Sequence, residues 1–143
     1  MLVETLLARL EKVKRTGPGR WLARCPAHAD RSPSLSVRET DQEHILIHCF
    51  GGCETRAVLA AVGLEFSDLF PERAADFIAR PERRPFPAAD VLRALSHEIT
   101  VVAVAGDFIL EGRAFTEADH ARLRLAVQRI HAGIDLAGAG RHG

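Results

Sequence analysis

The chain has 143 residues, enough for one ordinary domain or for a small domain with an appendage. Its 19 Lys and Arg balance its 19 Asp and Glu, so the net charge predicts no class of partner. No apolar run reaches the roughly 20 residues that a membrane span needs, and the N-terminus lacks a basic region followed by an apolar stretch. We therefore expect a cytoplasmic protein with no secretory signal and no membrane contact.

The first half of the chain combines a helix with short strands. Apolar residues at helical spacing predict an amphipathic helix over residues 2–14, which a Gly-Pro-Gly turn at residues 17–19 follows. Residues 20–24, 34–37 and 44–50 have the alternation or the aliphatic content of strands. Together they predict a three-stranded antiparallel sheet, which is marginally stable by itself.

All three cysteines of the chain lie on or near these strands. With His28 they form two pairs, Cys25/His28 at C-x2-H spacing and Cys49/Cys53 at C-x3-C spacing. Two such turns offer four donors to one tetrahedral Zn²⁺. Three thiolates and one imidazole close the coordination shell, so no position is left for a catalytic water. The sequence therefore predicts a structural zinc site.

Two alternatives to this ligand set are open. Three reduced cysteines could fill a core as small apolar residues, although the glycines and the proline around them are turn formers, which favours a metal site. His48 could replace His28. Adjacent strand residues point to opposite faces, however, so His48 should face away from a metal that Cys49 binds.

Beyond Cys53 the apolar period changes to that of a helix. Residues 54–62 predict a helix that Gly63 ends. The apolar residues that follow are expected to pack back on the sheet: Leu64, Phe66, Leu69 and Phe70. Residues 71–86, which are rich in proline and charge, predict a linker. Residues 1–70 would then be one small zinc domain.

Residues 87–143 predict two helices. Apolar residues repeat at helical spacing from about 88 to 111, although the run 99–104 would also suit a buried strand. Thr116 and Asp119 have the spacing of a capping box at the start of a second helix. The expected fold is therefore α+β, a zinc ribbon followed by a helical hairpin.

Two stretches around the predicted zinc ligands have a sequence that is specific enough to compare with known families. Residues 25–37 have the sequence CPAHADRSPSLSV, and residues 47–53 have the sequence IHCFGGC. Over roughly residues 15–70 the chain resembles the zinc-binding domain of bacterial-type DNA primases, which carries the same Cys-Pro-x-His and Cys-Phe knuckles and the same Pro-Ser turn. The C-x3-C pair resembles the variant in primase-related proteins of phages, plasmids and integrated elements.

The resemblance implies contact with single-stranded template DNA. In such primases a separate domain makes the primer, commonly a Toprim fold with a Glu and an Asp-x-Asp motif that hold magnesium. This sequence has neither an Asp-x-Asp motif nor the Gly-Lys-Ser/Thr of a phosphate-binding loop. We therefore expect a protein that is not an enzyme by itself.

A basic segment could supply the DNA contact. Five basic residues and no acidic one lie between residues 12 and 24, with a tryptophan among them, and such a mixture suits phosphates and unpaired bases. The candidate nucleic-acid-binding residues are Lys12, Lys14, Arg15, Arg20, Trp21, Arg24, Arg31, Arg38 and Phe50. Alternatively, these charges are solvated faces and both aromatic rings are core.

The expected function is that of a zinc-stabilised accessory protein that binds single-stranded DNA during the replication of a mobile element. Its C-terminal helices would bind another copy of the chain or a replication protein, such as a primase core or a helicase. The rival functions are a protein-interaction adaptor that uses the ribbon as a scaffold and a non-catalytic subunit of a split primase.

Overall fold

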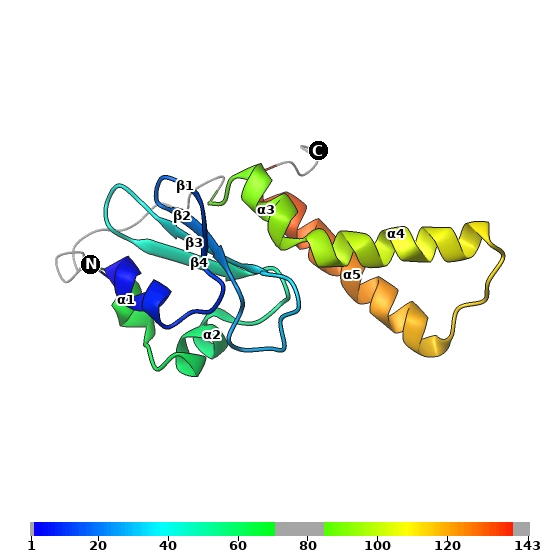
Figure 1. Ribbon diagram of the computed structural model, residues 1–143, viewed down its shortest axis with the longest axis horizontal. Coiled ribbons are helices and arrows are strands. Elements are labelled where there is room, and N and C mark those ends of the chain that lie inside the picture. Colours follow the sequence, from blue (N-terminus) through cyan, green and yellow to red (C-terminus); the bar gives the residue numbers. More distant parts are fainter. Residues whose placement is uncertain (1, 71–84, 139–143) are drawn as a thin grey trace.

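A computed structural model describes residues 2–70 and 85–138 of the chain. These residues form an α+β protein with a four-stranded antiparallel sheet in the order β1-β2-β3-β4 (Figure 1). The strands are β1 (Lys14–Gly17), β2 (Arg20–Ala23), β3 (Leu35–Glu39) and β4 (Ile45–Cys49). The helices are α1 (Leu2–Ala8), α2 (Thr55–Ala61), the 3-10 helix η1 (Phe66–Leu69), α3 (Ala88–Ala94), α4 (Ser96–Leu110) and α5 (Glu117–Leu136).

The sheet has one strand more than the sequence predicted, because the first helix is shorter. Helix α1 ends at Ala8, and Lys12 adopts a φ of 50°, a left-handed conformation that does not continue a helix. The chain then returns as the edge strand β1, which pairs with β2 through Arg15 opposite Trp21. The Gly-Pro-Gly turn therefore connects two strands and does not follow a helix.

Alternation along the strands gives the sheet two different faces. Residues that pair directly across antiparallel strands lie on the same face. One face carries Leu35, Val37 and Ile47, with Cys49 directly opposite Leu35. Helices α1 and α2 and the buried Leu69 pack on this face and complete the larger core. Cys49, which the sequence predicts as a zinc ligand, thus points into the side of the sheet that these helices cover.

The opposite face is covered by the C-terminal region. A second core joins Leu22 of β2 and Phe50 to Phe86 and to Val91 and Leu95. The docking also has a polar contact, since Thr16 donates a hydrogen bond of 2.9 Å to the carboxylate of Asp90, which is 2% exposed. The C-terminal helices are therefore packed against the ribbon through α3 and the C-terminal end of α5, while the joined far ends of α4 and α5 project away from it (Figure 1).

Residues 85–138 of the C-terminal region form three helices, whereas the sequence predicted two. The expected helix over residues 88–111 breaks at Leu95, which ends α3 and precedes α4. The run 99–104 is helical, so its alternative assignment as a strand is wrong. The predicted capping box at the start of α5 is present: Thr116 accepts from the Asp119 N–H and donates its own N–H to the Asp119 carboxylate.

Two other sequence predictions concern the apolar residues at 64–70 and the linker at 71–86. Of the residues expected to pack back on the sheet, Leu69 is buried, but Phe66 is 51% exposed because η1 turns its ring outward. Most of the predicted linker, residues 71–84, lies outside the described residues, whereas Phe86 near its end is 4% exposed and belongs to the second core. Within the described ranges, no helix is both long and apolar enough to cross a membrane.

Candidate metal centre

Four side chains from two separate segments, residues 25–28 and 49–53, converge at one end of the sheet. Cys25 follows β2, Cys49 ends β4, Cys53 precedes α2, and His28 lies in the loop between β2 and β3. Their donor atoms all lie within 4.8 Å of one another. A tetrahedral zinc ion with bonds of about 2.3 Å needs donors roughly 3.8 Å apart. Three sulfurs and one imidazole nitrogen at this separation fit zinc.

The orientation of His28 identifies the nitrogen that would face the metal. Its Nδ1 atom is 3.1 Å from the sulfur of Cys53 and 3.7 Å from that of Cys49. Its other nitrogen, Nε2, is 3.2 Å from Oδ1 of Asp30. A histidine that donates its second N–H to a carboxylate is held in one tautomer, which leaves Nδ1 as the ligand atom.

Besides its contact with His28, Asp30 also holds the backbone of the first knuckle, the turn at residues 25–28. Its Oδ2 atom accepts hydrogen bonds from the backbone N–H of Cys25 at 2.8 Å and from the N–H and hydroxyl of Ser34 at 3.1 and 3.0 Å. One carboxylate therefore connects both ligands of the first knuckle to β3. Sequence reasoning noted Asp30 only as part of a motif, and its position two residues after a ligand histidine was the available signal for this role.

The second knuckle depends on glycine. A Cβ atom on Gly51 would lie 2.7 Å from Cε1 of His28 and 3.3 Å from the sulfur of Cys49. Gly52 has a φ of 95°, a conformation that side chains disfavour. The two glycines between Cys49 and Cys53 thus let the chain turn tightly and let the imidazole approach the thiols.

The environment of the thiols favours metal binding. A hydrogen bond from Cys25 lowers the pKa of Cys49 to about 5 despite its burial, and Ser34 and the backbone of Gly51 and Cys53 contribute further hydrogen bonds. The same interaction and burial raise the pKa of Cys25. Cys49 is therefore a thiolate at neutral pH, the form that binds zinc, and ligation by the other thiols would release protons.

His48, the alternative ligand, lies on the opposite face of the sheet. Its ring packs edge-to-face on Phe50 with centroids 4.6 Å apart and lies 6.0 Å from Phe86. Burial lowers its pKa, which keeps the imidazole neutral in this apolar setting. The structure therefore brings His28, and not His48, to the three thiols.

The basic residues proposed for DNA binding do not form one surface. Arg20 pairs directly with Arg38, on the face that the C-terminal helices cover, and Lys14 lies on that face opposite Leu22. Arg15 and the half-buried Trp21 lie on the other face. Lys12 is exposed in the turn before β1. Strand alternation therefore divides the basic segment between the two sides of the sheet.

Three of the candidate DNA-binding arginines have a hydrogen bond or line a hollow in the structure. Arg38 donates a hydrogen bond of 2.8 Å to the carbonyl of Pro85. Arg24 and Arg31, together with Arg9, line a hollow of about 590 Å³ beside the first knuckle. The sequence did not single out Arg9, because only the fold brings α1 to the knuckle.

The predicted role of Phe50 as a base-stacking residue is wrong. Its ring is 3% exposed and packs edge-to-face with Phe86, with centroids 6.0 Å apart. An aromatic ring stacks on a base only when its face is accessible. Phe50 instead joins the second knuckle to the C-terminal helices.

Comparison with known proteins agrees with this geometry. The chain matches the family model of the CHC2 zinc finger, the zinc ribbon of the DnaG type, over residues 2–79, which is more than half of its 143 residues. No curated protein and no solved structure gives a match. The match includes all four converging donors and both knuckles. The chain therefore belongs to the CHC2 zinc finger family, the zinc ribbons related to those of bacterial DNA primases.

Proposed function

We propose that this protein is a zinc-stabilised accessory factor that binds single-stranded DNA in replication, in the cytoplasm and without catalytic activity of its own. The observation that carries the proposal is the match of residues 2–79 to a primase-type zinc ribbon. Zinc would be held by the four converging donors and would stabilise the two knuckles, because a small sheet of this kind has little core of its own.

The distribution of charge supports a limited contact with phosphates. Residues 1–70 carry no net charge, so binding must rest on local groups of arginines. The hollow beside the first knuckle has Arg9, Arg24 and Arg31 around it, and one nitrogen of Arg24, Nε, is buried with no hydrogen-bond partner among the described residues. An anion in this hollow would meet several guanidinium donors.

The chemistry of the zinc centre supports a role without catalysis. Three thiolates and one imidazole occupy the four positions that zinc uses in structural sites. In residues 2–70 and 85–138, these four side chains are the one group of His, Cys, Asp or Glu whose donor atoms converge as metal ligands do. Primer synthesis would then require a second protein, which is the arrangement of a split primase.

A second candidate function is that of a protein-interaction adaptor. Large apolar side chains lie exposed on α4, with Val104 at 47%, Ile109 at 63% and Leu110 at 86%. Such residues on projecting helices are typical of surfaces that bind another protein. The partner could be a primase core, a helicase or another copy of this chain. In this role the ribbon would serve as a scaffold.

Fluorescence anisotropy distinguishes these functions. Labelled single-stranded and duplex oligonucleotides are titrated with the zinc-loaded chain at several salt concentrations. A DNA-binding protein should prefer the single strand and lose affinity linearly in log salt, with a slope of a few phosphates. The double variant Arg9→Ala/Arg24→Ala removes two arginines from the hollow and should weaken binding several-fold. The exposed pair Arg56→Ala/Arg124→Ala removes the same charge elsewhere and should leave binding unchanged. Absence of binding at low salt would favour the adaptor.

A further inference from the structure

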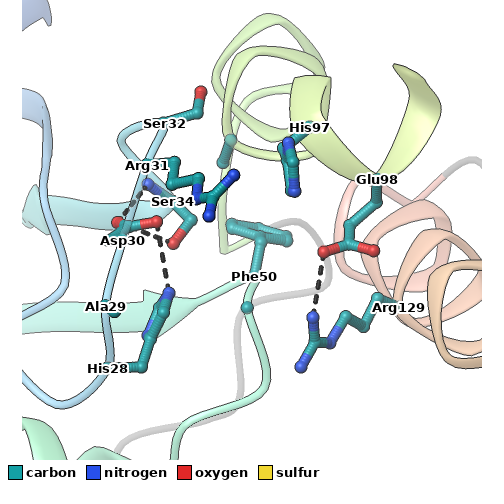
Figure 2. A pocket seen from close by; sticks show the side chains of 12 residues that line it. His28, Ala29, Asp30, Arg31, Ser32, Ser34, Phe50, His97, Glu98 and Arg129 are labelled. Atoms are coloured by element: carbon teal, nitrogen blue, oxygen red, sulfur yellow. Dashed lines mark hydrogen bonds and ion pairs between the residues drawn. The ribbon is translucent and has the colours of Figure 1, made fainter. Parts of the chain in front are cut away.

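A small pocket lies between the first zinc knuckle and the C-terminal helices (Figure 2). Its volume is about 170 Å³. One wall is the loop that carries Arg31 and Ser32, the other wall is formed by His97 and Arg129, and Phe50 lies between them. We propose that this pocket binds a phosphate group. If the phosphate belongs to DNA, this proposal rests on the proposed function. The binding of a phosphate group to the pocket does not depend on that function.

The pocket has hydrogen-bond donors that nothing else uses. Within the described part of the chain, no side-chain hydrogen bond or ion pair involves Arg31 or His97. Figure 2 shows both side chains extending into the space above Phe50. Arg129 is not one of these donors, because its Nη1 donates to Glu98 and its Nε and Nη2 atoms lie 3.5 and 3.6 Å from the Cβ position of Gly52 in the second knuckle.

The acidic residues of the pocket are already saturated. Asp30 accepts from the backbone N–H of Cys25, from the N–H and hydroxyl of Ser34 and from His28. Both carboxylate oxygens of Glu98 accept from arginines. A metal cation would therefore find no free oxygen ligands here. The free groups of the pocket are donors, which select an anion.

The arrangement of these donors favours a tetrahedral oxyanion. They come from two directions, namely from the knuckle loop that carries Arg31 and from the start of α4 that carries His97. A planar carboxylate is best matched by one fork of a single guanidinium, whereas phosphate presents oxygens in several directions. Because the zinc centre with its three thiolates adds a negative charge nearby, binding depends on direct hydrogen bonds and less on long-range attraction. A phosphate from a DNA strand and one from a nucleotide share this chemistry.

The proposal is tested by NMR on the zinc-loaded full chain titrated with inorganic phosphate. Phosphate should shift the Nε–H signal of Arg31 and the ring signals of His97 in a saturable way. The variant Arg31→Ala/His97→Ala removes two exposed side chains outside both cores and should keep its zinc content and its spectrum. It should weaken phosphate binding about tenfold or more, since charge-assisted hydrogen bonds are lost. Arg56→Ala, an exposed change on α2, is the matched control and should bind normally.

Two further arms identify the source of the phosphate and separate this proposal from the proposed function. A deoxynucleoside triphosphate and a single-stranded oligonucleotide are titrated into the same variants. If the oligonucleotide binds but Arg31→Ala/His97→Ala has no effect on it or on inorganic phosphate, the pocket proposal is overturned while DNA binding stands. If phosphate or the nucleotide shifts His97 and Arg31 but the oligonucleotide does not bind, the pocket stands and the proposed DNA binding fails. Absence of any shift with inorganic phosphate and nucleotide overturns the pocket.

Discussion

Arg129 on α5 donates a hydrogen bond of 2.9 Å to Oε1 of Glu98 on α4. Arg122 donates two more to the same carboxylate, at 2.8 and 3.1 Å, and Glu98 is only 5% exposed. The guanidinium of Arg129 also lies over the second knuckle, where a Cβ on Gly52 would be 3.5 Å from its Nε atom. A single arginine thus connects the helical pair to the zinc centre.

Replacing Glu98 with Gln should destabilise the C-terminal helices. The substitution leaves two arginines close together without the buried carboxylate that compensates them. Losing one partner of a buried ion pair costs about 3 to 5 kcal/mol, and because these arginines are partly exposed we expect about 2 kcal/mol. Urea unfolding of the zinc-loaded chain measures the change. Glu117→Gln, at the exposed start of α5, is the control and should change stability by less than about 0.5 kcal/mol.

The same carboxylate should make stability depend on pH. Burial would raise the pKa of Glu98, but the hydrogen bonds and charges of Arg122 and Arg129 outweigh it and lower the pKa below the ordinary value of 4.5. The stabilisation is then complete above pH 4.5 and is lost as the pH falls through the lower value of the folded state. The stability difference between the wild type and Glu98→Gln, followed by denaturation at a series of pH values, should therefore shrink in acid. A difference that stays constant down to pH 3 would contradict this account.

Removal of a zinc ligand should unfold the ribbon. Cys53→Ser should lose zinc, and because binding of structural zinc contributes on the order of 10 kcal/mol to the folding of small zinc domains, the sheet should lose its order. His48→Ala should keep zinc bound, since its ring faces the second core. Zinc content measured by a chromogenic chelator, together with circular dichroism, checks both. The opposite pair of results would show that the ligand set is wrong.

Asp30→Asn should weaken zinc binding while the fold is kept. The amide retains an acceptor for the backbone of the first knuckle but loses the charge that holds the His28 tautomer. Changes to such supporting residues typically reduce metal affinity by about 10- to 100-fold. Competition with a chelator of known affinity measures the change. Asp41→Asn, in the exposed turn before β4, is the control for the loss of one negative charge.

Two glycines in the C-terminal helices should respond to alanine in opposite directions. Gly133 is buried, and a Cβ there would collide with Cδ1 of Leu95, so Gly133→Ala should cost about 1 to 3 kcal/mol. Gly106 lies inside α4 with nothing within 4 Å of an added Cβ, so Gly106→Ala should stabilise the helix by about 0.5 to 1 kcal/mol. Thermal unfolding of the two variants gives the comparison. Equal effects would mean that α5 does not pack closely against Leu95.

Local patterns were enough to predict much of the ribbon. Short spacings place two donors on one turn, so the pairs Cys25/His28 and Cys49/Cys53 could be predicted as ligands without a structure. Strand alternation also indicated that His48 faces away from the metal. The helical period and the capping residues of α5 likewise depend only on neighbours in the chain.

Features that depend on contacts between segments far apart in the chain could not be predicted from local sequence patterns. The apolar period of the first helix continues past Ala8 because Leu10 is buried from a loop, so periodicity alone could not show where α1 ends and β1 begins. From the sequence, Phe50 could be an exposed residue that stacks on a base. In the structure Phe86 and α3 cover its ring. The basic segment is continuous in the sequence but is divided by the two faces of the sheet.

The metal ligands and the class of the fold could be predicted from residues close together in the chain, because both follow from spacing and periodicity over a few residues. The tertiary structure decided which side chains support the ligands and which remain available for binding. Asp30 acquires its role from Ser34 and His28, and Arg129 acquires its role from Glu98 and the second knuckle, more than 70 residues away along the chain. The physical reason is that burial and hydrogen bonding are set by the packing of segments that are remote in the sequence.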